Sequence, residues 1–283
     1  MHDRISLNNG TAIPALGFGT WCIADEAAED AVKTAIELGY RHIDTAQAYG
    51  NEAGVGRGVR DSGVPREELF VVSKVAAEHK SYAAAAASID ETLRTMGLSY
   101  LDMMLIHSPQ PWAEWRGENR YFEENRQVWR ALEDACKAGK LRAIGVSNFL
   151  QDDLDSLLPH CAVKPAVNQV LAHIGHMPDT LIDYCTERGI AVEAYSPIAH
   201  GEAVKNPVIT ETAARYGVSA AQLCIRYVLQ RGLIALPKAS SRAHIRDNAA
   251  LDFVIAAEDM ARLDELDFQD YGEYSFFPVF SGR

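Results

Sequence analysis

The chain has 283 residues, of which 27 are lysine or arginine and 39 are aspartate or glutamate, so its formal net charge is −12. This acidic balance argues against nucleic-acid binding, because a phosphate backbone is held by clustered cations. The sequence contains no apolar run of about 18 residues that would span a membrane, and its first residues lack the features of a secretory signal. Five cysteines at irregular spacing indicate reduced thiols. We therefore expect a cytoplasmic protein that binds neither nucleic acid nor membranes.

Residues 4–16 alternate between apolar and polar side chains on either side of Asn9 and Gly10. An Asn-Gly dipeptide takes positive φ angles easily, which is typical of the tight turn between two antiparallel strands. The sequence therefore predicts an N-terminal β-hairpin that precedes all other elements.

Short apolar runs after the hairpin alternate with segments of helical period. In residues 26–38, for example, Ala28, Val32 and Ile36 recur every fourth position. Strands that alternate with helices require crossover connections and a parallel sheet, and eight such repeats favour a closed (β/α)8 TIM barrel. We expect one domain over residues 1–283, with strands at 16–20, 41–45, 70–74, 101–106, 142–147, 166–169, 190–195 and 233–237.

The glycines of residues 54–58 do not form a dinucleotide-binding fingerprint, because they follow no strand and lie in a helical segment. The sequence favours close helix packing as their use. Three other segments, 108–123, 196–207 and 268–283, exceed the usual lengths of loops in such barrels and are expected to shape a pocket. The last of them carries Phe276, Phe277 and Phe280, for which capping the barrel and lining a pocket are equally good interpretations.

Polar residues stand where the predicted strands end, which is where this fold places its chemistry. Asp44 and Lys74 end neighbouring strands and are expected to form an ion pair. Tyr49 follows in a short loop that could fold back over the pair, where a nearby ammonium would favour the phenolate and make the phenol a stronger proton donor. His107 would orient a carbonyl group. This set suits proton delivery to a carbonyl that receives a hydride.

A metal site is the alternative interpretation of the same strand ends. His42 and Asp44 lie two residues apart and face one side of a strand, and Lys74 and His107 stand nearby in the predicted barrel. A second histidine pair at the later strand ends is missing from the sequence. We therefore rate a metal-dependent barrel hydrolase well below an enzyme that reduces a carbonyl group, and we predict no bound metal. We expect His42 to be an interior histidine with a hydrogen-bond partner.

Seven stretches in order resemble the aldo-keto reductase superfamily, in particular its prokaryotic aldehyde and diketo-sugar reductases: residues 39–59, 70–74, 102–109, 141–149, 168–170, 194–198 and 235–248. The resemblance implies a monomeric, NADP(H)-dependent carbonyl reductase that acts on a small carbonyl compound. It also implies a catalytic tetrad of Asp44, Tyr49, Lys74 and His107, with Tyr49 as the general acid. A subunit of the same fold that senses nicotinamide without useful turnover remains an alternative.

The resemblance further implies where the cofactor and the substrate bind. The nicotinamide carboxamide would meet Ser147, Asn148 and Gln169, whose side chains match its one acceptor and two donors. Tyr195 would stack on the nicotinamide ring. The other implied cofactor residues are Gly19, Thr20, Trp21, Ser196, Lys238, Ser240, Arg242, His244 and Asn248, and the implied substrate pocket contains Trp21, Trp112, Phe276 and Phe277.

Two departures from the family pattern bear on specificity. Ala239 and His244 stand where a serine and an arginine are commonest in the segment that binds the adenosine phosphate. A histidine grips phosphate less well than a guanidinium, so we expect a weaker NADP(H) preference and possible use of NAD(H). Ser108 replaces a common tryptophan, which should enlarge the pocket, and Trp112 is expected to fill part of that space. His200 is the one further loop histidine expected to reach a ligand.

Overall fold

The computed structural model describes residues 3–281 and begins with the predicted hairpin. Strands β1 (Arg4–Ser6) and β2 (Ala12–Pro14) pair antiparallel, with Ile5 opposite Ile13. Gly10 closes the turn at φ +83°, a conformation that favours glycine. The prediction of a hairpin is confirmed.

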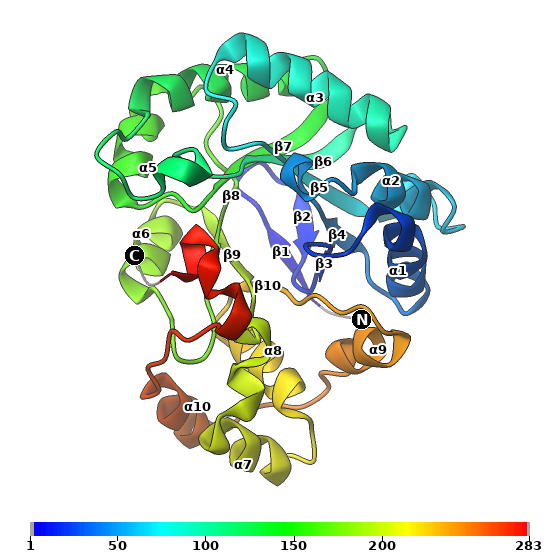
Figure 1. Ribbon diagram of the computed structural model, residues 1–283, viewed down its shortest axis with the longest axis vertical. Helices are drawn as coiled ribbons and strands as arrows, with labels where there is room; N and C mark the ends of the chain where they lie inside the picture. The colour runs from blue at the N-terminus through cyan, green and yellow to red at the C-terminus, as the bar shows by residue number, and fades with distance from the viewer. Residues whose placement is uncertain (1–2, 282–283) are drawn as a thin grey trace.

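Eight parallel strands follow and form one sheet in sequential order. The sheet closes on itself because the backbone NH groups of Gly17 and Gly19 donate to the carbonyls of Ala235 (2.9 Å) and Pro237 (3.0 Å). Helices surround these strands (Figure 1). All eight predicted strands are present, as β3 (Phe18–Gly19), β4 (His42–Asp44), β5 (Phe70–Val75), β6 (Leu101–Ile106), β7 (Leu141–Ser147), β8 (Val167–Leu171), β9 (Ala191–Tyr195) and β10 (Ile234–Leu236).

Local sequence signals explain where several helices begin. The hydroxyl of Ser81 accepts from the NH of Ala84, and Ser219 and Gln222 form a reciprocal capping box. The helices are α1 (Asp25–Glu37), α2 (Glu52–Arg60), α3 (Tyr82–Met96), α4 (Phe122–Lys137), α5 (Gln151–Leu157), α6 (Asp179–Glu187), α7 (Pro207–Arg215), α8 (Ala220–Gln230), α9 (Arg242–Ala249) and α10 (Ala257–Asp264).

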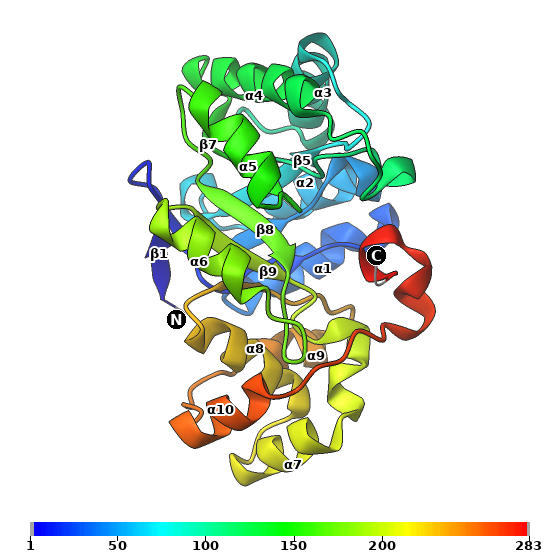
Figure 2. The same ribbon diagram turned by 90° about the vertical axis from the view of Figure 1, so that its left-hand side faces the viewer.

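The hairpin closes the N-terminal end of the barrel. Leu7 and Ile13 are buried and pack in one cluster with strand residues that point into the barrel, such as Val72 and Leu105. Figure 2 shows the hairpin on one side of the molecule and the C-terminal segment on the opposite side. The C-terminal end of the strands is therefore the open end.

The glycines of α2 permit close packing against two neighbouring helices, as the sequence predicts. A Cβ atom at Gly58 would lie 2.7 Å from Cβ of Val32 in α1, and one at Gly56 would overlap the backbone of Met96 in α3. Both added Cβ atoms would lie much closer to their neighbours than van der Waals contact allows. Only a glycine allows the three helices to approach this closely.

We expect a Gly56→Ala variant to be less stable than the wild type by about 1–3 kcal/mol, because the added methyl group forces α2 and α3 apart. Helix propensity alone predicts the opposite, a gain of about 1 kcal/mol for Gly→Ala in a helix interior. Urea unfolding followed by circular dichroism measures the difference. A variant as stable as the wild type would show that the helices do not pack closely here.

Candidate active site

A cavity of about 410 Å³ opens at the C-terminal end of the strands. Its walls come from the strand ends, from the loops after β3, β6 and β9, and from the C-terminal segment. The predicted site residues that line it are Gly19, Thr20, Trp21, Asp44, Tyr49, His107, Trp112, Ser147, Asn148, Gln169, Tyr195, Ser196, Lys238 and Phe277.

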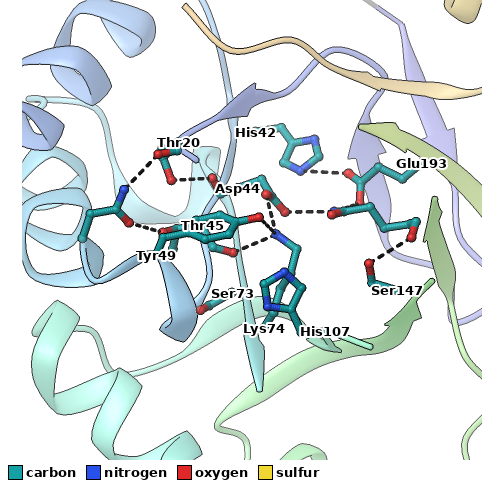
Figure 3. A network of polar contacts seen from close by, with 12 residues as sticks. Thr20, His42, Asp44, Thr45, Tyr49, Ser73, Lys74, His107, Ser147 and Glu193 are labelled. Carbon is teal, nitrogen blue, oxygen red and sulfur yellow. Dashed lines mark hydrogen bonds and ion pairs between the residues drawn. The ribbon is translucent and has the colours of Figure 1, made fainter. Parts of the chain in front are cut away.

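The expected ion pair is present. Nζ of Lys74 donates to Oδ1 of Asp44 at 2.6 Å and to the carbonyl of Thr45 at 2.9 Å, and Lys74 is completely buried. The short helical turn η1 (Gln47–Tyr49) brings Tyr49 back over the pair, with its hydroxyl 3.4 Å from Nζ. Figure 3 shows these side chains pointing toward one another. The ammonium of Lys74 on β5 thus contacts Asp44 at the end of β4 and both Thr45 and Tyr49 in the segment that follows it.

Charge and burial act in opposite directions on this group. Burial is the largest single effect on the pKa of Lys74 and lowers it, but the charge and hydrogen bond of Asp44 together with the other acidic neighbours leave the pKa above its ordinary value, so the ammonium is charged. Burial raises the pKa of Tyr49, and Lys74 only partly reverses this. The net direction differs from the expected lowering, because burial is the larger effect. The phenol is therefore neutral at pH 7 and carries the proton that a general acid needs.

His107 stands beside the phenol as a neutral imidazole. Its ring centre lies 5.5 Å from that of Tyr49 and 5.1 Å from that of Trp112, and both contacts are edge to face. Burial, helped by the charge of Lys74, lowers the pKa of His107 well below its usual value. A neutral ring keeps one N–H donor and one acceptor, which suits it to bind a carbonyl oxygen.

The ends of β7, β8 and β9 carry a connected set of amides and hydroxyls. Asn148 donates to the carbonyl of His107 and to Oγ of Ser147, both at 3.1 Å, and accepts from the hydroxyl of Tyr195 at 2.7 Å. Ser147 donates to the carbonyl of Gln169 at 2.9 Å. Asn148 has φ +63°, a strained conformation that is common at functional sites. These groups hold one another rigidly along one wall of the cavity.

Aromatic side chains form the opposite wall. Trp112 lies beside His107, and its ring is 5.1 Å from that of Phe277, whereas Ser108 is buried and does not line the cavity. Trp21 packs against Phe277 at 5.7 Å. Phe276 differs from the expectation: it is 78% exposed and lies outside the cavity, because it ends the helical turn η7 (Gly272–Phe276) on the solvent side.

The C-terminal segment is anchored before it reaches the cavity. The hydroxyl of Tyr271, which is buried, lies 3.0 Å from Nε2 of His173. Beyond this anchor, Tyr274 stacks on His200 at 4.4 Å, and Phe280 in the turn η8 (Pro278–Phe280) contacts His200 edge to face at 4.3 Å. The expected approach of His200 to the cavity is present, whereas Tyr274 was not foreseen because the segment has no periodic pattern.

The remaining predicted cofactor residues lie on or near α9. Nζ of Lys238 donates to Oγ of Ser240 at 3.0 Å. Arg242 forms two hydrogen bonds of 2.8 Å with the carboxylate of Glu37, at the end of α1. His244 is exposed and Asn248 is buried. Ser240, Arg242, His244 and Asn248 do not line the cavity described above, whereas Lys238 does.

A buried carboxyl group that the sequence analysis did not single out extends the site into the barrel. Glu193 lies on β9 and its Oε2 accepts from Nε2 of Gln169 at 2.7 Å. Its Oε1 lies 3.3 Å from Nε2 of His42, whose Nδ1 is 3.3 Å from the carbonyl of Pro14. His42 is thus an interior histidine, as predicted. A lone glutamate within an otherwise apolar strand was the signal that could have revealed this pair.

Within residues 3–281 no three His, Cys, Asp or Glu side chains are grouped so that they could hold a metal ion. The helices of the same residues include none with the length and hydropathy to cross a membrane. All five cysteines are free thiols.

The sequence model of the Aldo/keto reductase family matches residues 15–267. The chain belongs to this family. It is 41% identical to glyoxal reductase of Bacillus subtilis over 268 residues, which cover 94% of this chain and 93% of the relative. It is also 40% identical to morphine 6-dehydrogenase of Pseudomonas putida, with 93% and 90% of the two chains covered.

Solved structures of other aldo/keto reductases share the fold. An enzyme of the family from Brucella melitensis superimposes with a TM-score of 0.88 at 34% identity, over 94% of this chain and all of the other. A Bombyx mori aldo-keto reductase in complex with NADP gives 0.86 at 30% identity, over 99% of each chain. The (β/α)8 barrel and the family resemblance predicted from the sequence are confirmed for this aldo/keto reductase.

Proposed function

We propose that the protein is a carbonyl reductase that uses NADP(H) and reduces an aldehyde or ketone, with Tyr49 as the general acid. The observation that supports this most is the buried group of Asp44, Lys74 and Tyr49, because a charged ammonium lies 3.4 Å from the oxygen of a neutral phenol. Residues from one barrel, between Gly19 on β3 and Phe280 in η8, line the cavity, so we also propose that one domain and a single copy of the chain suffice for activity.

The chain's own residues account for the movement of the proton. Tyr49 holds a proton at its hydroxyl beside the cavity, and His107 binds the carbonyl oxygen and aligns it with that hydroxyl. When the proton leaves, negative charge develops on the phenol oxygen. The ammonium of Lys74 stabilises this charge by donating a hydrogen bond, and Asp44 keeps the ammonium in place. Bound reduced nicotinamide supplies the hydride.

The residues on the cavity wall fit a nicotinamide group. Both hydrogens of the Gln169 amide are accepted by side-chain oxygens of Asp44 and Glu193, whereas within residues 3–281 no protein donor meets its oxygen. That oxygen is therefore available to a carboxamide NH₂ group. Asn148 and Ser147 lie beside it, and Tyr195 offers an aromatic face. Lys238 stands at the edge of the same cavity and can meet a phosphate.

The substrate is proposed as a small uncharged carbonyl compound. Trp21, Trp112 and Phe277 make the far wall of the cavity aromatic, which favours apolar contacts over ionic ones. The names of the two similar proteins mention glyoxal and morphine, which are very different in size. We therefore propose a range of aldehydes and ketones rather than one compound.

A direct assay tests the proposal. Purified protein is mixed with reduced NADP or NAD and a panel of small aldehydes and ketones, with and without a chelator, and the loss of nicotinamide absorbance is followed. We expect turnover that requires the nicotinamide and is unaffected by the chelator. Cofactor binding without any turnover would favour a sensing subunit, and activity lost to the chelator would favour a metal-dependent enzyme.

The ion pair between Glu37 and Arg242 leads to a prediction on cofactor preference. A Glu37→Gln variant frees the guanidinium for the phosphate of NADP(H), so we expect its KM for NADPH to fall by about 2- to 5-fold, since exposed ion pairs are weak. Its KM for NADH should stay the same. Steady-state kinetics with both cofactors provides the measurement. Equal changes for NADPH and NADH would show that Arg242 does not meet the phosphate.

A further inference from the structure

Two buried polar atoms inside the barrel face each other without any other partner. Nε2 of His42 and Oε1 of Glu193 are 3.3 Å apart, both side chains are completely buried, and within residues 3–281 neither atom has a hydrogen-bond partner. Buried polar atoms are almost always satisfied. A single proton between these two atoms would satisfy both.

The other ring nitrogen of His42 decides which of the two atoms carries that proton. Nδ1 lies 3.3 Å from the carbonyl oxygen of Pro14, and a carbonyl can only accept. Nδ1 therefore carries a hydrogen, and because burial keeps the ring neutral by lowering the pKa of His42, Nε2 presents a lone pair. It follows that Oε1 of Glu193 is the donor, so Glu193 is a carboxylic acid. Burial acts in the same sense, since it lowers the pKa of His42 to about 4 and raises that of Glu193 to about 8.

The second oxygen of Glu193 connects the pair to the proposed cofactor site. Nε2 of Gln169 donates to Oε2 of Glu193 at 2.7 Å and to Oδ2 of Asp44 at 3.0 Å. Both amide hydrogens of Gln169 are thus donated to side chains in the interior of the barrel. The amide oxygen of Gln169 is left to face the cavity, and a flipped amide would place that oxygen against two acceptors.

We propose that Glu193 is a positioning residue: as a carboxylic acid bonded to His42, it fixes the Gln169 amide with its oxygen toward the nicotinamide carboxamide. This role rests on the proposed function. The protonation state also matters for the proton donor, because the groups around Glu193 are charged. They are Asp44 on β4 and Lys74 on β5. The neutral ring of His42 also faces Glu193, and the neutral phenol of Tyr49 lies beyond Lys74. An ionised Glu193 would add a second negative charge beside Asp44 and draw the ammonium away from Tyr49.

Two substitutions separate this proposal from a purely structural role. Glu193→Gln reproduces the proposed pattern, because its amide oxygen accepts from Gln169 and its NH₂ donates to His42. Glu193→Leu keeps the volume but removes both bonds. By tryptophan fluorescence quenching, we expect the Kd for NADPH to stay within about twofold in the first variant and to rise about tenfold in the second. The effect should appear in cofactor affinity more than in kcat.

The pH dependence and the infrared spectrum give readouts that do not depend on turnover. Wild-type affinity for NADPH should fall as the pH rises through about 8, where Glu193 loses its proton, and Glu193→Gln should lack this fall. At pH 6 the wild type should show the carbonyl stretch of a protonated carboxyl that Glu193→Gln lacks. Glu52→Gln is the matched control, because Glu52 is a second buried carboxyl of raised pKa that does not contact Gln169.

Three results would overturn the proposal. One is an infrared difference between the wild type and Glu193→Gln that shows an ionised carboxylate at pH 6. Another is a tenfold loss of NADPH affinity in Glu193→Gln equal to that in Glu193→Leu. The third is unchanged affinity in a folded Glu193→Leu protein. A wild type that binds no nicotinamide would instead overturn the proposed function and the positioning role, while the infrared comparison would still establish the protonation of Glu193.

Discussion

A Tyr49→Phe variant is expected to lose about 10²- to 10⁴-fold in kcat, the contribution typical of a general acid. The substitution removes only the hydroxyl that lies 3.4 Å from Nζ of Lys74, and the ring still packs edge to face on His107. No other neutral hydroxyl lies next to the ammonium in the described structure, so no other side chain can deliver the proton in its place. Steady-state assay of carbonyl reduction measures the loss.

The matching control is cofactor binding in the same variant. Because Gln169, Asn148 and Ser147 are held by one another and not by Tyr49, fluorescence quenching by NADPH should give a Kd close to that of the wild type. Full turnover in Tyr49→Phe would refute the assignment of the acid. A simultaneous loss of binding would mean that the phenol supports the cavity itself.

The second large effect is expected for Lys74→Met. The ammonium is completely buried and bonded to Asp44 at 2.6 Å, so its removal leaves an unpaired buried carboxylate and costs about 3–5 kcal/mol of unfolding free energy. Without the ammonium, nothing opposes burial and the charge of Asp44, so the pKa of Tyr49 rises further and the phenol becomes a weaker acid. We expect kcat to fall by about 10²-fold or more.

A double variant separates these two consequences. Adding Asp44→Asn to Lys74→Met removes the orphaned charge, so most of the lost stability should return in urea unfolding. Turnover should stay low, because the cation beside Tyr49 is still missing. Recovery of both quantities together would indicate that Lys74 serves folding alone, and recovery of neither would point to general damage to the barrel.

The sequence was sufficient to predict the barrel, and the reasons are local. Each strand is a short apolar run bounded by a helix signal, and Asn9 and Gly10 mark the hairpin turn. The approach of Asp44, Lys74, Tyr49 and His107 was also predictable, because the carboxyl ends of parallel strands must meet at one end of the barrel.

Contacts that join distant parts of the chain were not predictable in the same way. Strand alternation tells which face Glu193 occupies, but it does not identify His42, on another strand, as its partner. The pair of Arg242 and Glu37 joins residues 205 positions apart and depends on how α1 and α9 sit against each other. Phe276 was misplaced because short helical turns follow no apolar period that indicates an inside and an outside.

The C-terminal segment differs from the rest of the cavity in how it is attached. The proton donor and its neighbours come from strands and their immediate loops, whereas Phe277 and Phe280 come from short turns that follow the anchor at Tyr271 and His173. The segment can thus be exchanged beyond Tyr271 without disturbing the barrel hydrogen bonds. Grafting this stretch from a relative would then retune selectivity among carbonyl compounds and leave the chemical step intact, which makes the tail a natural unit for engineering and for divergence.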